Sequence, residues 1–241
     1  MKILLYGKFA DDLLPALAEA GGERVERNPD VVVSYGGDGA LLGAEREFPG
    51  VPKLPMRDRR TAPLCPIHAS YAEPLRHLLE GTLVKRTLMK LAGSVHGRTL
   101  VGINDIFIHH ANPVSAIRYR VLIDDVPYGR EIVGDGVGVA TVHGSTAYYR
   151  SITHSVFRSG IGLAFSNSTE VTNHLVLPET TVIRIPLTRG PAILVADNDP
   201  EQIPVAEGDE IVIARIPESV MVYGLDLFMC PACRRLRHPR E

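Results

Sequence analysis

Hydrophobic and polar positions in the first 80 residues of the chain alternate between the patterns of strands and helices. Residues 31–33 form an apolar run that is typical of a buried parallel strand, and residues 40–48 after them have helical spacing. Two further helices are predicted at residues 12–20 and 71–80, where leucines recur on one face and a glycine follows. Such alternation predicts a parallel sheet with ligands at the carboxyl ends of its strands.

The pattern changes near residue 82, and the rest of the chain is predicted to form short strands. In residues 116–123, Ile117, Tyr119, Val121 and Ile123 alternate with Arg118 and Arg120, which is the period of a half-buried antiparallel strand. Turn signals separate this segment from the other β-prone segments, which are residues 83–91, 99–108, 137–141, 161–165, 181–185, 192–195 and 210–216.

We therefore expect two domains in an α/β + β protein. The first is a Rossmann-like α/β domain of residues 1–82, to which residues 220–241 return, and the second is a β-sandwich of residues 83–219. The composition fits a globular protein, with 45% hydrophobic and 22% charged residues. A net charge of −2 argues against nucleic acid or a membrane surface as partner, and the absence of an apolar span or leader predicts a cytoplasmic protein.

Shortly after the apolar run of residues 31–33, the chain has three glycines around one carboxylate: Gly36-Gly37-Asp38-Gly39. Glycines let the backbone turn sharply and approach a ligand closely, and the start of the following helix favours phosphate. Asp38 in such a loop suits a general base or a metal-side ligand. The motif predicts phosphoryl transfer to a hydroxyl. The alternative interpretation is an ordinary strand-to-helix turn that Asp38 caps.

A second group of motifs lies in the β region. Asn104-Asp105 begins an apolar strand, Asp135 precedes another, and residues 144–148 (Gly-Ser-Thr-Ala-Tyr) follow it. Asn can bond the edge of an adenine, carboxylates can bind ribose hydroxyls, and small residues before Tyr148 let a flat base lie close. Taken singly, these motifs are also compatible with an Asx turn and a helix cap.

The order of these motifs, with Leu175-Val-Leu-Pro178 after them, resembles the NAD kinase family. Gly-Gly-Asp-Gly alone is shared with diacylglycerol and sphingosine kinases and with phosphofructokinase-like proteins, whereas the combined order is specific to the NAD kinase group. The resemblance implies phosphorylation of NAD to NADP with ATP or polyphosphate and Mg²⁺, an NAD-binding β domain, and a homo-oligomer, either dimer or tetramer.

The resemblance also implies a role for each matching residue. Asp38 would be the general base on the 2′-hydroxyl of the adenosine ribose, and Asp135 would lie near the nicotinamide half. The remaining candidates would bind the rest of the nucleotides: Gly36, Gly37 and Gly39 around the phosphates, Asn104 and Asp105 at the NAD ribose and adenine, and Thr146, Ala147 and Tyr148 along the adenine, with Ser151 close by.

The chain departs from the family pattern at several positions. Ala40 stands where the family usually has Thr, residues 55–60 replace an Asn and a Gly-rich turn, residues 152–156 replace a Gly-Gly pair and Pro, and Asp197-Asn198 replaces Asp-Gly. These departures leave two other functions open, a kinase of a lipid or sugar hydroxyl and a catalytically weak NAD(P)-binding regulator. The adenosine-type motifs argue against the first, and the base-like Asp38 argues against the second.

The cysteines suggest a structural zinc site. Cys65-Pro-Ile-His68 and Cys230-Pro-Ala-Cys233 both have the two-residue spacing that lets a pair of ligands meet one tetrahedral zinc, with His238 as an alternative fourth ligand. The other interpretation is three reduced cytosolic thiols and a surface histidine.

Overall fold

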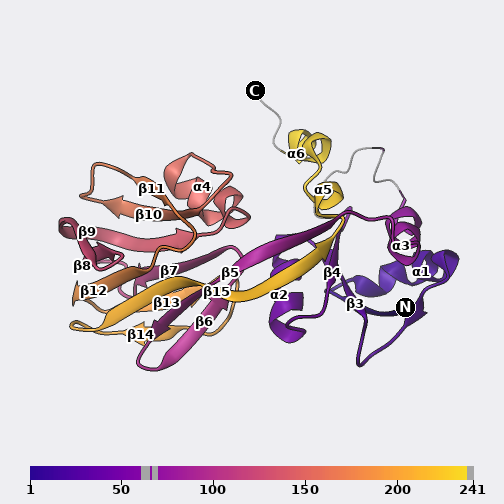
Figure 1. Ribbon diagram of the computed structural model, residues 1–241, viewed down its shortest axis with the longest axis horizontal. Coiled ribbons are helices and arrows are strands. Elements are labelled where there is room, and N and C mark those ends of the chain that lie inside the picture. The colour runs from indigo at the N-terminus through magenta and orange to yellow at the C-terminus, as the bar shows by residue number, and fades with distance from the viewer. Residues whose placement is uncertain (61–65, 67–69, 238–241) are drawn as a thin grey trace. The chain divides into compact units, whose positions relative to one another are not determined.

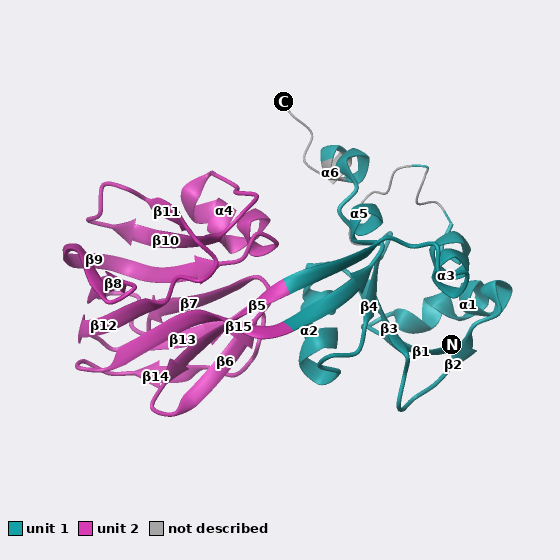
Figure 2. Ribbon diagram, viewed as in Figure 1, with its two compact units in different colours: residues 1–88, 219–241 teal, residues 89–218 magenta. Residues whose placement is uncertain are grey.

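The computed structural model describes residues 1–60, 66 and 70–237 (Figure 1). The chain divides into two compact units, which Figure 2 colours separately. Unit 1 comprises Met1–Leu88 and Ser219–Glu241, and unit 2 comprises Met89–Glu218. Among the helices of the described residues, none combines the length and the apolar composition needed to cross a membrane.

Unit 1 is built on a parallel sheet. Its strands are β1 (Lys2–Tyr6), β2 (Glu23–Arg24), β3 (Val31–Gly36) and β4 (Lys53–Arg57), in the order β2-β1-β3-β4 with every pair parallel. The end of β15 (Glu210–Tyr223) joins the far side of β4, where Val222 pairs in parallel with Lys53. The predicted parallel sheet is thus confirmed, and its strands β1, β3 and β4 end at one edge.

Helices pack on both faces of this sheet. Alternate residues of β3 point to opposite faces, so Val31 and Val33 join the cluster that contains Leu17 and Leu75, whereas Val32 packs with Ala44. The predicted helices at 12–20, 40–48 and 71–80 are confirmed within a few residues, although the first begins with a 3₁₀ turn. The elements are η1 (Ala10–Leu13), α1 (Leu14–Ala20), α2 (Asp38–Glu47), α3 (Ala72–Leu79), α5 (Leu225–Phe228) and α6 (Pro231–Arg237).

A buried ion pair connects the end of α2 to the start of β4. Lys53 Nζ lies 2.5 Å from Glu45 Oε2, and both side chains are at most 5% exposed. Lys53 also donates to the carbonyl of Phe48 at 2.7 Å and to that of Val51. The Lys53 ammonium therefore bonds three oxygens, which compensates much of the cost of burying its charge.

Unit 2 is built from antiparallel strands. The long β9 pairs over its first half with β8 and over its second half with both β7 and β10. On either side the pairing continues through β12 to β15 and through β13 to β14. The strands not yet bounded are β5 (Lys85–Val95), β6 (Arg98–Gly102), β7 (Asp105–His110), β8 (Ile117–Ile123), β9 (Val126–Ala140), β10 (Ile161–Ser168), β11 (His174–Leu177), β12 (Ile183–Arg189), β13 (Ala192–Ala196) and β14 (Ile203–Val205).

The alternation read in β8 is confirmed, because Ile117, Tyr119 and Val121 are buried while Arg118 and Arg120 are exposed. The single strand predicted at residues 99–108 is wrong. β6 ends at Gly102 and β7 begins at Asp105, so a turn interrupts the predicted strand. An apolar residue in that turn, buried Ile103, continues the hydrophobic pattern and hides the break from a periodicity argument.

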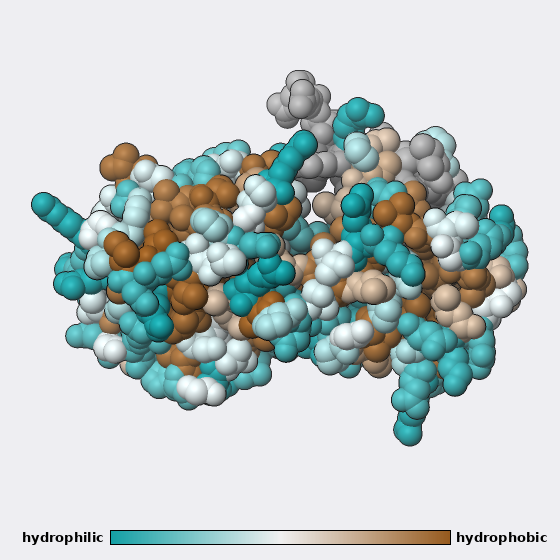
Figure 3. Space-filling model, in the orientation of Figure 1, coloured by the Kyte–Doolittle hydropathy of each residue, from teal (hydrophilic) through white to brown (hydrophobic). Residues whose placement is uncertain are grey.

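The surface of unit 2 is mixed in character. On the face drawn in Figure 3, brown apolar patches over this unit lie among teal hydrophilic ones. Exposed apolar side chains of unit 2 include Val126 at 65%, Val171 at 97% and Val176 at 49% exposure. Single exposed apolar side chains of this kind are common on protein surfaces and mark no site by themselves.

Candidate functional site

The glycine motif forms the predicted strand–turn–helix in unit 1. β3 ends at Gly36, and α2 begins at Asp38. Gly36 has φ +152°, a conformation that side chains rarely adopt. A second glycine, directly after the neighbouring strand β1, lets the chain pass close to β3. Gly7 follows β1 with φ +132°, and a Cβ there would lie 2.3 Å from the carbonyl oxygen of Tyr35. The loop after β1 therefore passes closely against the end of β3.

An open cavity of about 650 Å³ lies at these strand ends. It is lined by Gly36, Gly39 and Ala40 of the glycine motif, by Lys8 after β1, and by Asp58 after β4. The volume is in the range of small-molecule sites. An exposed ammonium on Lys8 beside the start of a ten-residue helix favours an anionic group. Lys8 and Asp58 belong to no sequence motif.

Asp58 is a buried carboxylate in this cavity, at 2% exposure. It accepts hydrogen bonds from Arg60 N at 2.9 Å and Arg60 Nε at 3.1 Å. Burial raises the pKa of Asp58, but these bonds to Arg60 outweigh it, and the pKa falls below the usual value. The Tyr35 hydroxyl lies 3.3 Å from Asp58 Oδ1 and 2.7 Å from the Tyr71 hydroxyl. The pKa of Tyr35 is raised by burial and then by its bond to Tyr71, so the cavity holds an ionised carboxylate and a protonated phenol.

In unit 2, the Asn104-Asp105 motif lies in the turn that leads into β7. Both residues are buried, at 4% and 8% exposure. Thr141, at the end of β9, holds this turn: its Oγ1 donates to the carbonyl of Ile103 at 2.6 Å, and its backbone N–H donates to the carbonyl of Asn104 at 2.8 Å. Thr141 is a site residue that the sequence analysis missed, since it ends a strand and matches no motif.

The second motif of unit 2 packs directly on the first. Gly144 begins η3 (Gly144–Thr146), and a Cβ at Gly144 would lie 2.0 Å from the carbonyl oxygen of Asn104. The Gly144 N–H also donates to Thr141 Oγ1 at 3.0 Å. Only glycine permits this approach, so the structure brings together the two predicted adenosine motifs.

The rest of this motif leads into helix α4 (Tyr148–Thr153), whose first residue is Tyr148. Tyr148 is 41% exposed, and its ring lies edge-on to Phe107 at 4.8 Å and tilted against His109 at 5.5 Å. Thr146 Oγ1 donates to the carbonyl of His143, Ala147 lies between η3 and α4, and Ser151 Oγ donates to the carbonyl of Tyr148 at 2.7 Å.

Tyr148 and Ser151 also line an open, largely polar cavity of about 470 Å³, together with residues of β10 and the loop after it. Asp135 lies on β9, where its carboxylate accepts a hydrogen bond from Asn167 at 2.8 Å and lies 3.6 Å from His110 Nδ1. His109, whose ring contacts Tyr148, and His110 are neighbours on β7, and β7 pairs with β9, which carries Asp135. Burial, and then the neighbouring His110, lowers the pKa of His109.

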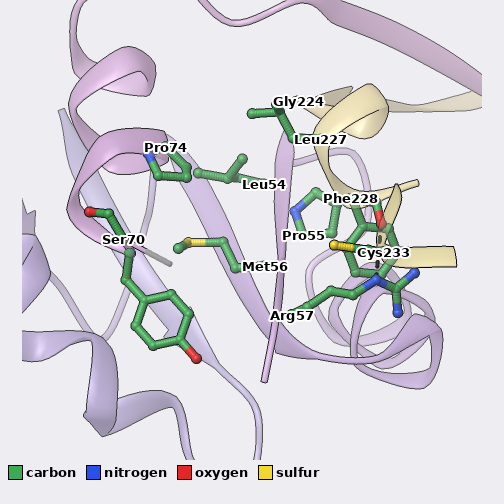
Figure 4. A pocket seen from close by; sticks show the side chains of 11 residues that line it. Leu54, Pro55, Met56, Arg57, Ser70, Pro74, Gly224, Leu227, Phe228 and Cys233 are labelled. Atoms are coloured by element: carbon green, nitrogen blue, oxygen red, sulfur yellow. Dashed lines mark hydrogen bonds between the residues drawn. The ribbon is translucent and has the colours of Figure 1, made fainter. Parts of the chain in front are cut away.

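Cys233 lies in a separate pocket of unit 1 (Figure 4). The walls come from Leu54 and Met56 of β4, Pro74 of α3 and Leu227 of α5. The pocket is apolar and measures only about 40 Å³, far below the size of a nucleotide site. At its rim, the guanidinium of Arg57 stacks on Phe228 at 3.9 Å and donates to the Phe228 carbonyl at 2.9 Å. We interpret this pocket as a packing gap in unit 1.

The zinc hypothesis stays a prediction. Cys65 and His68 lie outside the described residues, as does His238. Cys230 and Cys233 are described, but among the described residues no group of three or more His, Cys, Asp and Glu side chains could hold a metal ion. The half-site at Cys230 and Cys233 therefore has no described third ligand of these types.

Known proteins resemble the chain in sequence and fold. No family model matches it. The NAD kinase of Acidithiobacillus ferrooxidans is 29% identical over 221 residues, which is 84% of this chain and 72% of that protein. The NAD kinase of Chloroflexus aggregans is 30% identical over 203 residues, which is 78% of this chain and 72% of that protein.

Two solved structures share the fold. An NAD kinase from Archaeoglobus fulgidus in complex with ATP aligns with a TM-score of 0.77 at 19% identity and covers 96% of both chains. Yeast NADH kinase complexed with NADH aligns with a TM-score of 0.72 at 21% identity, over 84% of this chain and 65% of the yeast chain. The fold is accordingly mixed α/β and rich in sheet, like that of these kinases. Because these NAD kinases share about 30% of their residues with the chain over most of both sequences, the chain belongs to the NAD kinase family.

Proposed function

We propose that the chain is an NAD kinase, which transfers a phosphoryl group from ATP or polyphosphate to the 2′-hydroxyl of the adenosine ribose of NAD. The observation that carries this proposal is the close packing of Gly144 on the Asn104 carbonyl, since it joins the two adenosine-type motifs into one surface in a chain of this family. The acceptor oxygen forms the new O–P bond, the bond to the leaving ADP or shortened polyphosphate breaks, and the proton of the hydroxyl leaves to a base.

Asp38 takes the role of that base in our proposal. It is the first residue of α2, directly after the glycine turn, where a carboxylate also benefits from the positive end of the helix dipole. A general base positioned on the hydroxyl contributes about 10²–10⁴-fold to the rate. Gly36, Gly37 and Gly39 let the backbone of this loop approach the phosphates of the donor, because none of them has a side chain in the way.

The acceptor nucleotide is assigned to the surface in unit 2. Asn104 and Asp105 bind the ribose and adenine of NAD, and the exposed ring of Tyr148 offers a face for the base. Thr146, Ala147 and Ser151 line the adenine, and Asp135 lies toward the nicotinamide half; the support for these roles is the family resemblance and the placement of Ser151 with Tyr148 in one cavity.

The residues of unit 1 fit a divalent cation with the donor. Mg²⁺ is typically bound by one or two carboxylates together with substrate phosphates, and Asp58 is the carboxylate that lines the cavity of the glycine loop. When bound, Mg²⁺ would neutralise charge on the phosphates. Asp58 would hold it from the cavity, while Lys8 would offset further negative charge from the rim.

Ala40 favours a second function. It lines the cavity of the glycine loop, so the hydroxyl that the family usually carries there is missing from the donor side itself. A weakly active regulator that binds NAD or NADP would explain this loss. It differs from the kinase in one measurable respect, because it predicts binding with little or no turnover.

We propose further a Rossmann-like domain of residues 1–82, to which residues 220–241 return, and a β-sandwich of residues 83–219, close to but not identical with the bounds of units 1 and 2. The support is the parallel sheet of the first and the antiparallel strands of the second. The proposal includes a cytoplasmic homo-oligomer, dimer or tetramer, and the support for this state is the family resemblance. Light scattering after gel filtration measures that state.

The test of the kinase is NADP formation by the purified protein with NAD, Mg²⁺ and either ATP or polyphosphate, read with an NADP-specific dehydrogenase. Asp38→Asn should lower kcat by about 10²–10⁴-fold and leave the Kd for NAD nearly unchanged. Asp11→Asn, an exposed carboxylate of the same unit, is the matched control and should keep wild-type rates. Wild-type NAD binding without turnover would favour the regulator, and full activity of Asp38→Asn would remove Asp38 from the base role.

A further inference from the structure

A carboxylate to which the sequence motifs assign no role holds the Asn104 turn. Asp197 follows β13 in unit 2, and its carboxylate accepts three backbone hydrogen bonds from successive residues. Oδ2 accepts from the N–H of Ile103 at 2.7 Å. Oδ1 accepts from the N–H of Asn104 at 2.8 Å and of Asp105 at 3.0 Å. Three N–H groups converging on one carboxylate form a strong, charge-assisted contact.

The backbone of Asp197 completes the arrangement. Its N–H donates to the carbonyl of Asp105 at 3.0 Å, and Asp197 adopts a left-handed conformation with φ +47°. That conformation is uncommon for a residue with a side chain, although Asp tolerates it better than most. The cost of this conformation is met because the same residue bonds the turn through both its carboxylate and its backbone.

Asp197 and Thr141 hold the turn from two sides. The N–H groups of residues 103–105 all donate to Asp197, while Thr141 donates to the carbonyls of Ile103 and Asn104. Together with the Asp105 carbonyl, which accepts from Asp197, every backbone N–H and C=O group of residues 103–105 has a partner. The orientation of the Asn104 and Asp105 side chains therefore depends on these two residues.

The space around Asp197 is shaped for this contact. A Cβ on Gly102 would lie 2.8 Å from Asp197 Oδ1 and 2.7 Å from the carbonyl oxygen of Asp105. Gly102, the last residue of β6, thus lies where the Asp197 carboxylate approaches, and it leaves room for that carboxylate because it has no side chain. The neighbouring Asp199, by contrast, accepts from Glu201 N at 2.9 Å within its own turn.

We propose that Asp197 is a positioning residue for the acceptor nucleotide, which holds Asn104 and Asp105 in the geometry that binds NAD. The inference deepens the proposed NAD kinase function and rests on it. The physical reason is that the N–H groups of residues 103–105 converge on one point. Without an acceptor there they would have no shared partner to fix the turn, whereas the Asp197 carboxylate accepts from all three. Asp197 acts through these residues and is assigned no contact with the reacting atoms.

Asp197→Asn is the test variant, because it keeps the shape of the side chain but turns one acceptor oxygen into a donor that faces an N–H. Loss of a hydrogen bond to a charged acceptor corresponds to about 10-fold to 100-fold in affinity. We expect the KM for NAD to rise by that factor, while the KM for ATP stays within about twofold of wild type. A KM does not depend on the folded fraction, so partial unfolding lowers only the apparent kcat.

Asp199→Asn is the matched control and should leave both KM values unchanged. Asp197→Glu is the second variant, because it keeps the charge and displaces the carboxylate by one methylene; it should raise the KM for NAD less than Asp197→Asn does. A wild-type KM for NAD in Asp197→Asn would overturn the inference. If Asp197→Asn does not fold, a wild-type KM for NAD in Asp197→Glu overturns it instead.

Equilibrium binding separates this inference from the kinase proposal. If the wild-type protein binds NAD without turnover, the kinase proposal fails. The Kd for NAD then takes the place of the KM: it should rise about 10-fold to 100-fold in Asp197→Asn and stay unchanged in Asp199→Asn. If the wild-type protein neither turns over nor binds NAD in calorimetry, both proposals are wrong.

Discussion

Gly144→Ala is the most direct perturbation of the proposed acceptor surface. Gly144 and Asn104 belong to different motifs, and their contact is made through backbone on the Asn104 side. A Cβ at Gly144 would lie 2.0 Å from the Asn104 carbonyl oxygen, 2.4 Å from its carbon and 2.7 Å from its Cα. None of these atoms belongs to a flexible side chain, so one of the two turns must move.

The size of that movement can be worked out from the contact. Ordinary van der Waals contact begins at 3.4 Å, so relief of the 2.0 Å approach requires a displacement of about 1.4 Å. Overpacking a tight interior typically costs about 1–3 kcal/mol of stability. A misplacement of about 1 Å at a binding surface can cost about 10²-fold in activity. We therefore expect kcat/KM for NAD to fall about 10²-fold, with a higher KM for NAD.

Coupled NADP assays at varied NAD and ATP, together with urea unfolding, measure both effects. Gly93→Ala is the matched control in the same unit, since its Cβ would lie 2.5 Å from Ile106 Cγ2 and 3.3 Å from Leu194 Cδ1, which are side-chain atoms. It should lose stability but keep the wild-type KM for NAD. A Gly144→Ala enzyme whose KM for NAD stays within twofold of wild type would refute the reasoning.

Three further predictions concern unit 1. Lys8→Met should raise the KM for ATP up to about fivefold through lost charge in the glycine-loop cavity, with no change for Lys2→Met at the other end of β1; equal KM values for the two variants would contradict the assignment. Lys53→Met leaves the Glu45 carboxylate buried without its ammonium and should lower the free energy of unfolding by about 3–5 kcal/mol, most of which the double variant with Glu45→Met should restore in urea melts. Asp58 has a folded-state pKa below its unfolded value, so the stability it contributes is present above about pH 4 and is lost as the pH falls through the folded-state pKa. Between about pH 6 and about pH 3, Asp58→Asn should therefore lose less free energy of unfolding than wild type in urea melts, and equal losses would contradict this.

The glycine loop shows what could be predicted from a local pattern. The apolar run before Gly36 and the helical spacing after Asp38 both reflect short-range geometry, and the strand, turn and helix lie where they were expected. Lys8 and Asp58 could not be found this way. They enter the same cavity only because β1, β3 and β4 are parallel neighbours whose carboxyl ends meet.

The Asn104 turn shows the opposite case. Its motif was recognised, but the turn itself was predicted as continuous strand because buried Ile103 preserves the hydrophobic pattern. The turn is visible only in its partners, Thr141 from the end of β9 and Asp197 from the end of β13.

The sequence by itself determined the alternation of strands and helices in the first third, the β-rich character of the rest, and the motifs that indicate an NAD kinase. These features depend on neighbours in the chain, so composition and period reveal them. Only the tertiary structure decided that Gly144 packs on Asn104, that Asp197 and Thr141 hold the turn, and that Lys8 and Asp58 share a cavity. Those contacts join residues far apart in sequence, and the register of hydrogen-bonded strands decides which of them meet.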